Sequence, residues 1–310
     1  MHARVFITGG TGFFGKSMLD YRLRHPEWKW AKAEWVILSR AAECFKTSYP
    51  HLANQPGISL VTGDVRSFAF PEGQFDAIIH AATSTTMTLS DKEMSSIIAD
   101  GTNRVVAFAK AMGISKILFT SSGAVYGPRT SPSSEKDVCL PTTAYGKGKL
   151  SAEKLLADSG LEAKIARCFA FVGPHLARKS HYAIGNFIQD CLDGNPITIN
   201  GDGTPLRSYL YADDLVEWLF AILERGNAGQ PYNVGSDEAV SILTLAKRVR
   251  DALGASSPII VERHQEDAPA STYVPVVDKA KATLGLCQKV SLEDAVRMSV
   301  WPQSIPCLSP

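Results

Sequence analysis

Tyr145 and Lys149 are of residue types that can transfer a proton, and they stand four positions apart in the segment 141–149. On a helix this spacing places both side chains on one face. A phenol with an ordinary pKa of about 10 is a poor acid at neutral pH, and a neighbouring ammonium lowers that pKa toward the working range. The pair therefore indicates acid–base chemistry, although the same spacing also arises by chance on helices.

Ser122 supplies a hydroxyl where α/β proteins commonly bind ligands. It ends the apolar run Lys116–Ser122, which we expect to be a strand. Ligands bind at the carboxyl ends of parallel strands. There Ser122 could hydrogen-bond a substrate oxygen while Tyr145 transfers its proton. The alternative is a turn residue at a strand end.

A glycine-rich turn lies close to the N-terminus, between an expected strand at Arg4–Thr8 and an expected helix at Gly15–His25. Gly9, Gly12 and Gly15 give the pattern G-x-x-G-x-x-G. Phosphate must approach backbone N–H groups at a helix N-terminus, and a Cβ atom would obstruct that approach. The position of the turn directly after a strand predicts a dinucleotide-binding site.

A second pattern overlaps this turn, because residues 10–17 also satisfy the P-loop expression G-x-x-x-x-G-K-[ST]. A P-loop NTPase additionally needs an Asp at the end of a hydrophobic strand to hold Mg²⁺. The later strand ends, at Ser39, at 81–82 and at Ser122, supply no such Asp. We therefore favour the dinucleotide turn and expect Lys16 to be a solvated lysine.

The elements that must position these residues alternate between strand and helix. This alternation predicts an α/β fold, a Rossmann-type doubly wound parallel sheet with a smaller C-terminal substrate-binding region. We expect residues 1–169 to form the dinucleotide-binding domain, residues 211–236 to return to it, and residues 170–310 to form the substrate-binding region. Further strands are expected at 35–39, 58–62, 77–81 and 163–169, and helices at 92–112, 143–159, 212–225 and 244–253.

Composition excludes several classes of protein. The 310 residues contain 32 Lys and Arg and 31 Asp and Glu, so the net charge is +1. This balance argues against nucleic-acid binding, which needs a basic surface. The longest apolar run, Trp218–Leu223, is far shorter than the roughly 18 residues of a membrane span. The six cysteines show no metal-ligand spacing. We expect a cytoplasmic protein with no metal site and no membrane or nucleic-acid partner.

Trp28 and Trp30 lie in the stretch 22–32, between the first helix and the second strand. This stretch could be a partner surface, but we expect a solvated loop.

Taken together, the motifs show that the chain resembles the extended short-chain dehydrogenase/reductases, in the branch of nucleotide-sugar epimerases, dehydratases and reductases. The resemblance runs from about Val5 to Met298. Several ordered motifs at plausible spacing are far more specific than any one of them. They are the glycine turn at 8–15, Gly63-Asp64, His80-Ala81-Ala82, the run at 121–127, Tyr145 with Lys149, Gly201-Asp202-Gly203 with Arg207, 211–215 and 232–235.

The resemblance implies roles for individual residues. Ser122, Tyr145 and Lys149 would be the catalytic residues, and Arg207 would bind the diphosphate of a nucleotide-diphosphate sugar. Arg207 could otherwise form a surface salt bridge. The helices at 92–112 and 143–159 would form the interface of a homodimer. Cofactor contacts would come from Gly9, Gly12, Phe13, Phe14, Gly15, Ser39, Arg40, Asp64 (to adenine), Val65, Ala81 and Ala82, together with Tyr145 and Lys149, and further substrate contacts from Thr83, Ser84 and Ser122.

Two departures from the family pattern narrow the reaction. Dehydratases of the family usually carry carboxylates just after the Ser/Thr, where this chain has Gly123 and Ala124. Without an acid to protonate a leaving hydroxyl, elimination of water is not expected. Related enzymes also commonly place Asn at the position of Ala170, where it contacts the substrate diphosphate, so Arg207 and backbone amides would carry more of that binding.

The third departure concerns the cofactor. An acidic residue at the end of the second strand accepts the ribose hydroxyls of NAD. Here that strand ends in Ser39-Arg40, and a hydroxyl and a guanidinium suit a 2′-phosphate. We therefore favour NADP(H) over NAD(H). The alternative is that Arg40 is merely exposed and Glu43 serves the ribose.

The same Ser-Tyr-Lys set supports two outcomes at one sugar carbon. A reductase transfers a hydride to a sugar carbonyl while Tyr145 supplies the proton. An epimerase oxidises the C4 hydroxyl and returns the hydride to the other face. Because Ser39-Arg40 favours a phosphorylated cofactor, we expect an NADP(H)-dependent reductase of a nucleotide-linked 4-keto-6-deoxy sugar, with an NAD-dependent nucleotide-sugar 4-epimerase as the alternative. A non-catalytic dinucleotide-binding sensor is a third, weaker interpretation.

Overall fold

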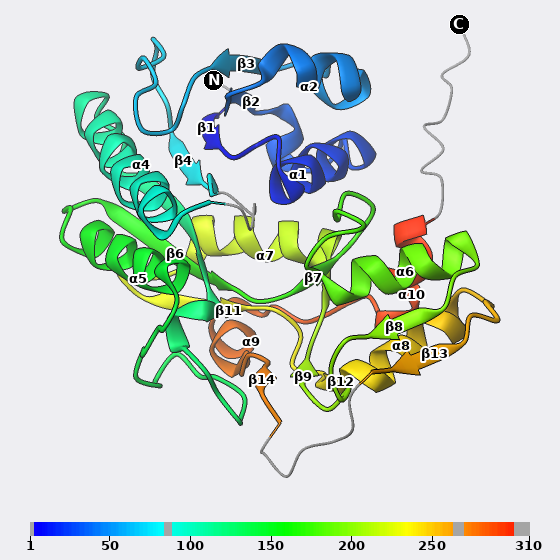
Figure 1. Cartoon of the computed structure of the whole chain (residues 1–310). Helices are drawn as coiled ribbons and strands as arrows, with labels where there is room; N and C mark the ends of the chain where they lie inside the picture. Colours follow the sequence, from blue (N-terminus) through cyan, green and yellow to red (C-terminus); the bar gives the residue numbers. More distant parts are fainter. Residues whose placement is uncertain (1–2, 84–88, 263–269, 301–310) are drawn as a thin grey trace, which may run out of the picture.

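A central sheet of seven parallel strands organises the computed structural model, which describes residues 3–83, 89–262 and 270–300. The strand order is β11-β6-β5-β4-β1-β2-β3 (Figure 1). The chain runs outward from β1 in both directions, so the order reverses between β1 and β4, which is where doubly wound sheets bind ligands. The predicted α/β class with a parallel sheet is confirmed. The strands are β1 (Arg4–Thr8), β2 (Glu34–Ser39), β3 (Ile58–Thr62), β4 (Ala77–His80), β5 (Lys116–Ser122), β6 (Glu162–Cys168) and β11 (Pro231–Val234).

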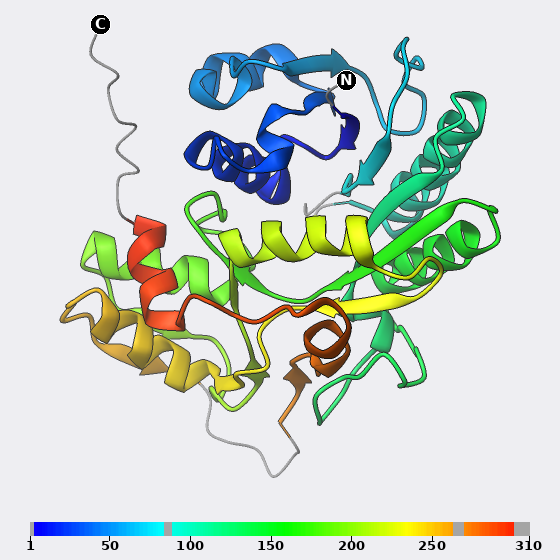
Figure 2. The ribbon, with the colours of Figure 1, turned by 180° about the vertical axis from the view of Figure 1, so that it is seen from behind.

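Helices cover both faces of the sheet. Because successive side chains of a strand point to opposite sides, each strand contributes to two cores. In β1, Val5 and Ile7 pack in one core, and Phe6 packs in the other. The first core includes α1 (Phe13–Arg24) and α7 (Ala212–Arg225), and the second includes α4 (Asp91–Ala111) and α5 (Ala144–Ala157). Both views show α4 and α5 side by side on their face of the sheet (Figures 1 and 2). No helix in the three described ranges is long and apolar enough to span a bilayer.

Helix α5 begins where the sequence places its capping residue. The Thr143 side chain accepts a hydrogen bond from Gly146 N at 3.1 Å, which satisfies a donor of the first turn. Tyr145 therefore lies in the first turn of the helix and Lys149 in the second. Helix α4 opens on a full capping box between Ser90 and Glu93.

A third core holds the C-terminal part of the chain together. It includes side chains of α6 (Ala183–Asp193), α8 (Ile242–Ala252) and α10 (Leu292–Val300). Strand β11 returns from this region to pair with β6, and α9 (Asp278–Leu284) contacts β11. Short strands complete the region: β7 (Phe171–Val172) with β10 (Leu210–Tyr211), β8 (Ile197–Ile199) with β13 (Ile259–Val261), and β9 (Leu206–Arg207) between β12 (Val240–Ser241) and β14 (Thr272–Tyr273).

Part of the stretch 22–32, predicted as a solvated loop, is exposed, but Trp28 and Trp30 are half-buried against α7, so the prediction was wrong for these two residues. The ring centroids of Trp28 and Trp30 lie 4.6 and 5.2 Å from that of Phe220 on α7. The indole N–H of Trp30 donates to Glu224. Contact between the large aromatic rings outweighs the polar character of the surrounding residues.

Candidate active site

The glycine-rich turn joins β1 to α1 and has the shape of a phosphate cradle. Gly9 has φ +74°, and a Cβ atom there would come within 2.5 Å of Ala81 O. A Cβ atom on Gly15 would come within 2.1 Å of the Gly10 backbone. Gly12 is the N-cap of α1, and among the described residues no side chain caps its first turn and no acidic residue lies in it. The first-turn N–H groups are thus available to an anion, and the turn fits the diphosphate of a dinucleotide.

The two aromatic residues of the turn lie beneath it. Phe14 packs its ring edge-on against Phe171 of β7, with ring centroids 5.3 Å apart, and Phe13 packs against the third core. Lys16, predicted to be solvated, instead lies 4.7 Å from the centroid of the Tyr49 ring, and its Nζ donates to Tyr49 Oη at 3.3 Å. Tyr49 is the N-cap of α3 (Pro50–Ala53), so the cation–π contact holds this ammonium against the start of that helix.

At the end of β2 stand a hydroxyl and a guanidinium. Ser39 Oγ accepts from Ala41 N at 3.2 Å and lies 3.3 Å from Thr11 Oγ1 in the glycine turn. Arg40 is exposed. Glu43, the alternative ligand for a ribose, is exposed and accepts from Lys46 Nζ at 2.8 Å. Neither residue at this strand end is a carboxylate, so Ser39 and Arg40 can both donate to a phosphate monoester.

Asp64 follows β3 and lies close to this strand end. Both of its carboxylate oxygens accept from the Arg66 guanidinium, at 2.8 and 2.9 Å. These hydrogen bonds lower the pKa of Asp64, and Arg40 adds to the effect through space. Val65 is buried, with its side chain against Gly101 of α4.

The segment after β4 lies against the glycine turn. Ala82 N donates to Thr8 Oγ1 at 3.1 Å, and the carbonyl of Ala81 faces Gly9. The Thr83 hydroxyl is buried and has no hydrogen-bond partner in the described part of the chain, which suits a ligand contact. Ser84, predicted to bind substrate, lies outside the described residues.

His80 fixes this segment and carries no charge. Thr102 Oγ1 donates to Ile98 O, so it accepts from His80 Nε2 at 3.1 Å. The other ring nitrogen, Nδ1, then accepts from Thr8 Oγ1 at 2.8 Å. Burial lowers the pKa of His80 to about 3, so the ring stays neutral and holds the strand end in place.

Ser122, Tyr145 and Lys149 come together at the carboxyl end of β5. The Tyr145 phenol lies close enough to the Ser122 hydroxyl for Ser122 to lower its pKa. Lys149 is 1% exposed; its Nζ donates to Thr120 O at 2.8 Å and lies 5.8 Å from the centroid of the Tyr145 ring. One helix and one strand therefore place a hydroxyl, a phenol and an ammonium in a single cluster.

The electrostatics of this cluster differ from the expectation. Burial lowers the pKa of Lys149 to about 8. Burial also raises the pKa of Tyr145 above its ordinary value, and this effect is larger than any lowering by its neighbours. The prediction that Lys149 brings the pKa of Tyr145 down toward neutrality is thus wrong for the ligand-free protein. Tyr145 keeps its proton and is poised to donate it.

Tyr273 is a residue of this cluster that the sequence did not indicate. Its Oη lies 3.2 Å from Ser122 Oγ and 3.4 Å from Cys168 O. Its ring packs on that of Phe169, with centroids 4.9 Å apart. Tyr182, the N-cap of α6, is a second such phenol, close enough to raise the pKa of both Tyr145 and Tyr273.

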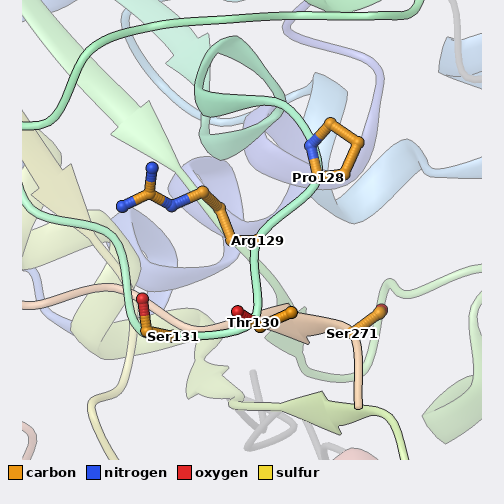
Figure 3. A pocket seen from close by; sticks show the side chains of 5 residues that line it. All are labelled: Pro128, Arg129, Thr130, Ser131 and Ser271. Carbon is orange, nitrogen blue, oxygen red and sulfur yellow. The ribbon is translucent and has the colours of Figure 1, made fainter. Parts of the chain in front are cut away.

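Arg207 lies on β9 beside these phenols and lowers the pKa of Tyr273 through space. Its Nη1 donates to the carbonyls of Leu206 at 2.8 Å and Ser271 at 3.2 Å. Ser271 also lines a cavity of about 550 Å³. Figure 3 shows the cavity between the loop 128–131, which includes Arg129, and Ser271. The salt bridge considered for Arg207 is absent among the described residues, where no carboxylate pairs with it.

The positions that depart from the family pattern are small. Gly123 opens the short 3-10 helix Gly123–Tyr126, and a Cβ atom on it would come within 2.7 Å of the Phe169 ring. Ala124 contributes its backbone N–H, which donates to Ser122 Oγ at 3.1 Å. Ala170 is half-buried and offers no side-chain donor. The site therefore gains no acid from these positions.

A buried polar network lies behind the cluster. Glu153, one helical turn beyond Lys149, pairs with Arg167 on β6 through Nε at 3.0 Å and Nη2 at 2.7 Å. Glu153 also accepts from Ser121, and Arg167 donates to Tyr126 Oη at 3.0 Å. Tyr126 in turn donates to Asn233 Oδ1 at 2.8 Å. This network ties β5, α5, β6 and β11 together directly beneath the site.

Comparison with known proteins supports the family that the sequence motifs resemble. The model of the NAD dependent epimerase/dehydratase family matches residues 5–235. UDP-glucuronic acid decarboxylase 1 of Arabidopsis thaliana is 29% identical over 306 residues, covering 94% of this chain and 68% of that protein. The Xenopus tropicalis protein of the same name is 27% identical, covering 96% of this chain and 71% of that protein.

Solved structures share the fold. UDP-glucose 4-epimerase from Thermotoga maritima superposes with a TM-score of 0.82 at 20% identity, covering 96% of this chain and 97% of that chain. UDP-glucuronic acid 4-epimerase from Bacillus cereus, solved with UDP-glucuronic acid and NAD, superposes with a TM-score of 0.81 at 21% identity and the same coverage.

Proposed function

Because the chain belongs to the NAD-dependent epimerase/dehydratase family, whose members act on nucleotide sugars, we propose that it is an NADP(H)-dependent reductase of a nucleotide-linked 4-keto-6-deoxy sugar. The observation that carries the proposal is the cluster of Ser122, Tyr145 and Lys149 beside the glycine turn, with Tyr145 held in its protonated form. A protonated phenol is the group that reduction of a carbonyl requires, because the alkoxide formed at C4 must take up a proton.

The residues of the turn and of the strand ends fit a phosphorylated dinucleotide. The first-turn N–H groups of α1 would hold its diphosphate, and Ser39 with Arg40 would hold its 2′-phosphate. Asp64 would accept from the adenine amino group. When bound, the reduced nicotinamide supplies the hydride.

The chain's own residues would carry the rest of the reaction. Ser122 donates a hydrogen bond to the C4 carbonyl oxygen and polarises it, and Tyr145 transfers its proton to the same oxygen as negative charge develops there. The ammonium of Lys149 stabilises the phenolate that Tyr145 becomes. Arg207 would bind the diphosphate of the nucleotide sugar, since its guanidinium has no carboxylate partner among the described residues and lies beside the cluster.

Neighbouring reactions of the family make different demands. Elimination of water needs an acid for the leaving hydroxyl, and Gly123 and Ala124 provide none. Oxidation of a C4 hydroxyl uses the same hydroxyl, phenol and ammonium, so a nucleotide-sugar 4-epimerase is the second candidate. The description of the matching family names epimerases, which supports this second candidate.

A substrate panel tests the proposal. The purified protein is mixed with NADPH or NADH and with nucleotide-linked 4-keto-6-deoxyhexoses, UDP-hexoses or UDP-glucuronic acid, the last because the decarboxylase relatives are named for it. We expect stoichiometric loss of NADPH with a keto sugar, and loss of that turnover in Tyr145→Phe. Turnover of a hexose to its epimer without net cofactor consumption would favour the epimerase, and full function in Tyr145→Phe would favour a non-catalytic sensor.

A further inference from the structure

Ser122 Oγ has more hydrogen-bonding neighbours than a catalytic donor needs. A hydroxyl has one proton to donate and two lone pairs to accept with. One lone pair of Ser122 is taken by the N–H of Ala124 at 3.1 Å. Tyr273 Oη lies 3.2 Å from Ser122 Oγ, and the Tyr145 phenol is close enough for Ser122 to lower its pKa. The one proton of Tyr273 can go to Ser122 Oγ or to Cys168 O, which is 3.4 Å away.

The phenol of Tyr273 is held in place from both sides. Thr272 N, just before it, donates to Arg129 O at 2.7 Å. Just after it, Ser133 N donates to Val274 O at 2.9 Å. The ring lies against Phe169. The backbone on either side and the ring contact together fix the distance between Tyr273 Oη and Ser122 Oγ.

We propose that Tyr273 is a positioning residue that acts through Ser122: it donates its one proton to the nearer of its two acceptors, Ser122 Oγ and not Cys168 O, and so fills the second lone pair and leaves only the serine proton to face a substrate oxygen. With both lone pairs filled, Ser122 is committed to donating to the carbonyl. This inference rests on the proposed role of Tyr145 as proton donor to the same oxygen.

Without the Tyr273 hydroxyl, a lone pair of Ser122 becomes free beside Tyr145. The Tyr145 proton would then be drawn to Ser122 and away from the carbonyl, so the bound substrate would less often be in a reactive arrangement. Binding of the diphosphate should change little, because the Arg207 side chain is held by the carbonyls of Leu206 and Ser271 and not by the Tyr273 hydroxyl. The expected signature is a fall in kcat with little change in KM.

The test is a double-mutant cycle on the full chain, with whichever nucleotide sugar of the panel the wild type turns over. Tyr273→Phe keeps the ring on Phe169 and removes only the hydroxyl. We expect about a tenfold fall in kcat, the size of one hydrogen bond, with KM within about twofold. In a protein that already carries Ser122→Ala, Tyr273→Phe should cause no further loss. The matched control, Tyr182→Phe, should have the same effect with and without Ser122→Ala.

A second readout needs no turnover. In cofactor-free protein labelled with ¹³C at the tyrosine Cζ atoms, the Tyr273 signal, assigned by its loss in Tyr273→Phe, should shift on Ser122→Ala. The inference would be overturned if the kcat losses of Tyr273→Phe and Ser122→Ala simply multiply in the double variant. It would also be overturned if the Tyr273 signal does not move. If instead Tyr145→Phe keeps full turnover, the proposed function itself fails, and the NMR shift alone then decides whether Tyr273 and Ser122 are coupled.

Discussion

Glu153 supports the active site from behind, and its removal should be costly. The side chains of Glu153 and Arg167 are 6% and 7% exposed, so the pair lies in the protein interior. Glu153 accepts three hydrogen bonds, two from Arg167 and one from Ser121. Glu153→Ala removes all three and leaves a buried guanidinium whose remaining side-chain partner is the Tyr126 hydroxyl, through Nη1. An uncompensated buried charge of this kind costs about 3–5 kcal/mol.

We therefore expect the free energy of unfolding to fall by about 4 kcal/mol in Glu153→Ala, measured by urea denaturation at neutral pH. The matched control is Glu43→Ala, which removes an ion pair with Lys46 whose side chains are 81% and 43% exposed. That loss should stay below about 1 kcal/mol. Replacing both Glu153 and Arg167 by Met should recover part of the stability, because neither partner then leaves the other's charge buried and unpaired. A Glu153→Ala protein as stable as the Glu43→Ala control would refute the reasoning.

Three further predictions concern titration and cofactor choice. Burial raises the pKa of Asp214 from 3.8 to about 6. The folded protein therefore binds this proton more tightly than the unfolded chain, and urea titrations should show the wild type losing about 2 kcal/mol relative to Asp214→Asn between about pH 4 and pH 7. Because the pKa of Lys149 is about 8, kcat/KM should fall as the pH rises through that value, and in Lys149→Arg any remaining activity should lack this fall in a pH–rate profile. Arg40→Ala should lower kcat/KM for NADPH about tenfold and leave that for NADH within about twofold, measured in steady-state assays with each cofactor.

Local spacing made much of the structure predictable. The glycine turn, the strand ending at Ser122 and the helix that carries Tyr145 and Lys149 each depend on residues close in sequence. Their meeting follows from the rule that parallel strands present their carboxyl ends to one side. The fold class followed from the same alternation of strand and helix.

What could not be predicted depends on contacts between distant segments. Tyr273 meets Ser122 across 151 positions, from a two-residue strand that no hydrophobic pattern marks. Lys16 and Trp28 were assigned to solvent because their aromatic partners, Tyr49 and Phe220, lie on other elements. The pKa of Tyr145 depends on how deeply the assembled site buries it, which no spacing reveals.

The most direct measurement of the central claim is transfer of a labelled hydride. The protein is given a nucleotide-linked 4-keto-6-deoxyhexose and NADPH that carries deuterium as its transferable hydride, and the product is analysed by NMR. The account predicts one deuterium at sugar C4 for each NADPH consumed, and no incorporation in Tyr145→Phe. A parallel sample contains a nucleotide-linked hexose in place of the keto sugar. Its conversion to an unlabelled product inverted at C4, with no net loss of cofactor, would contradict the account.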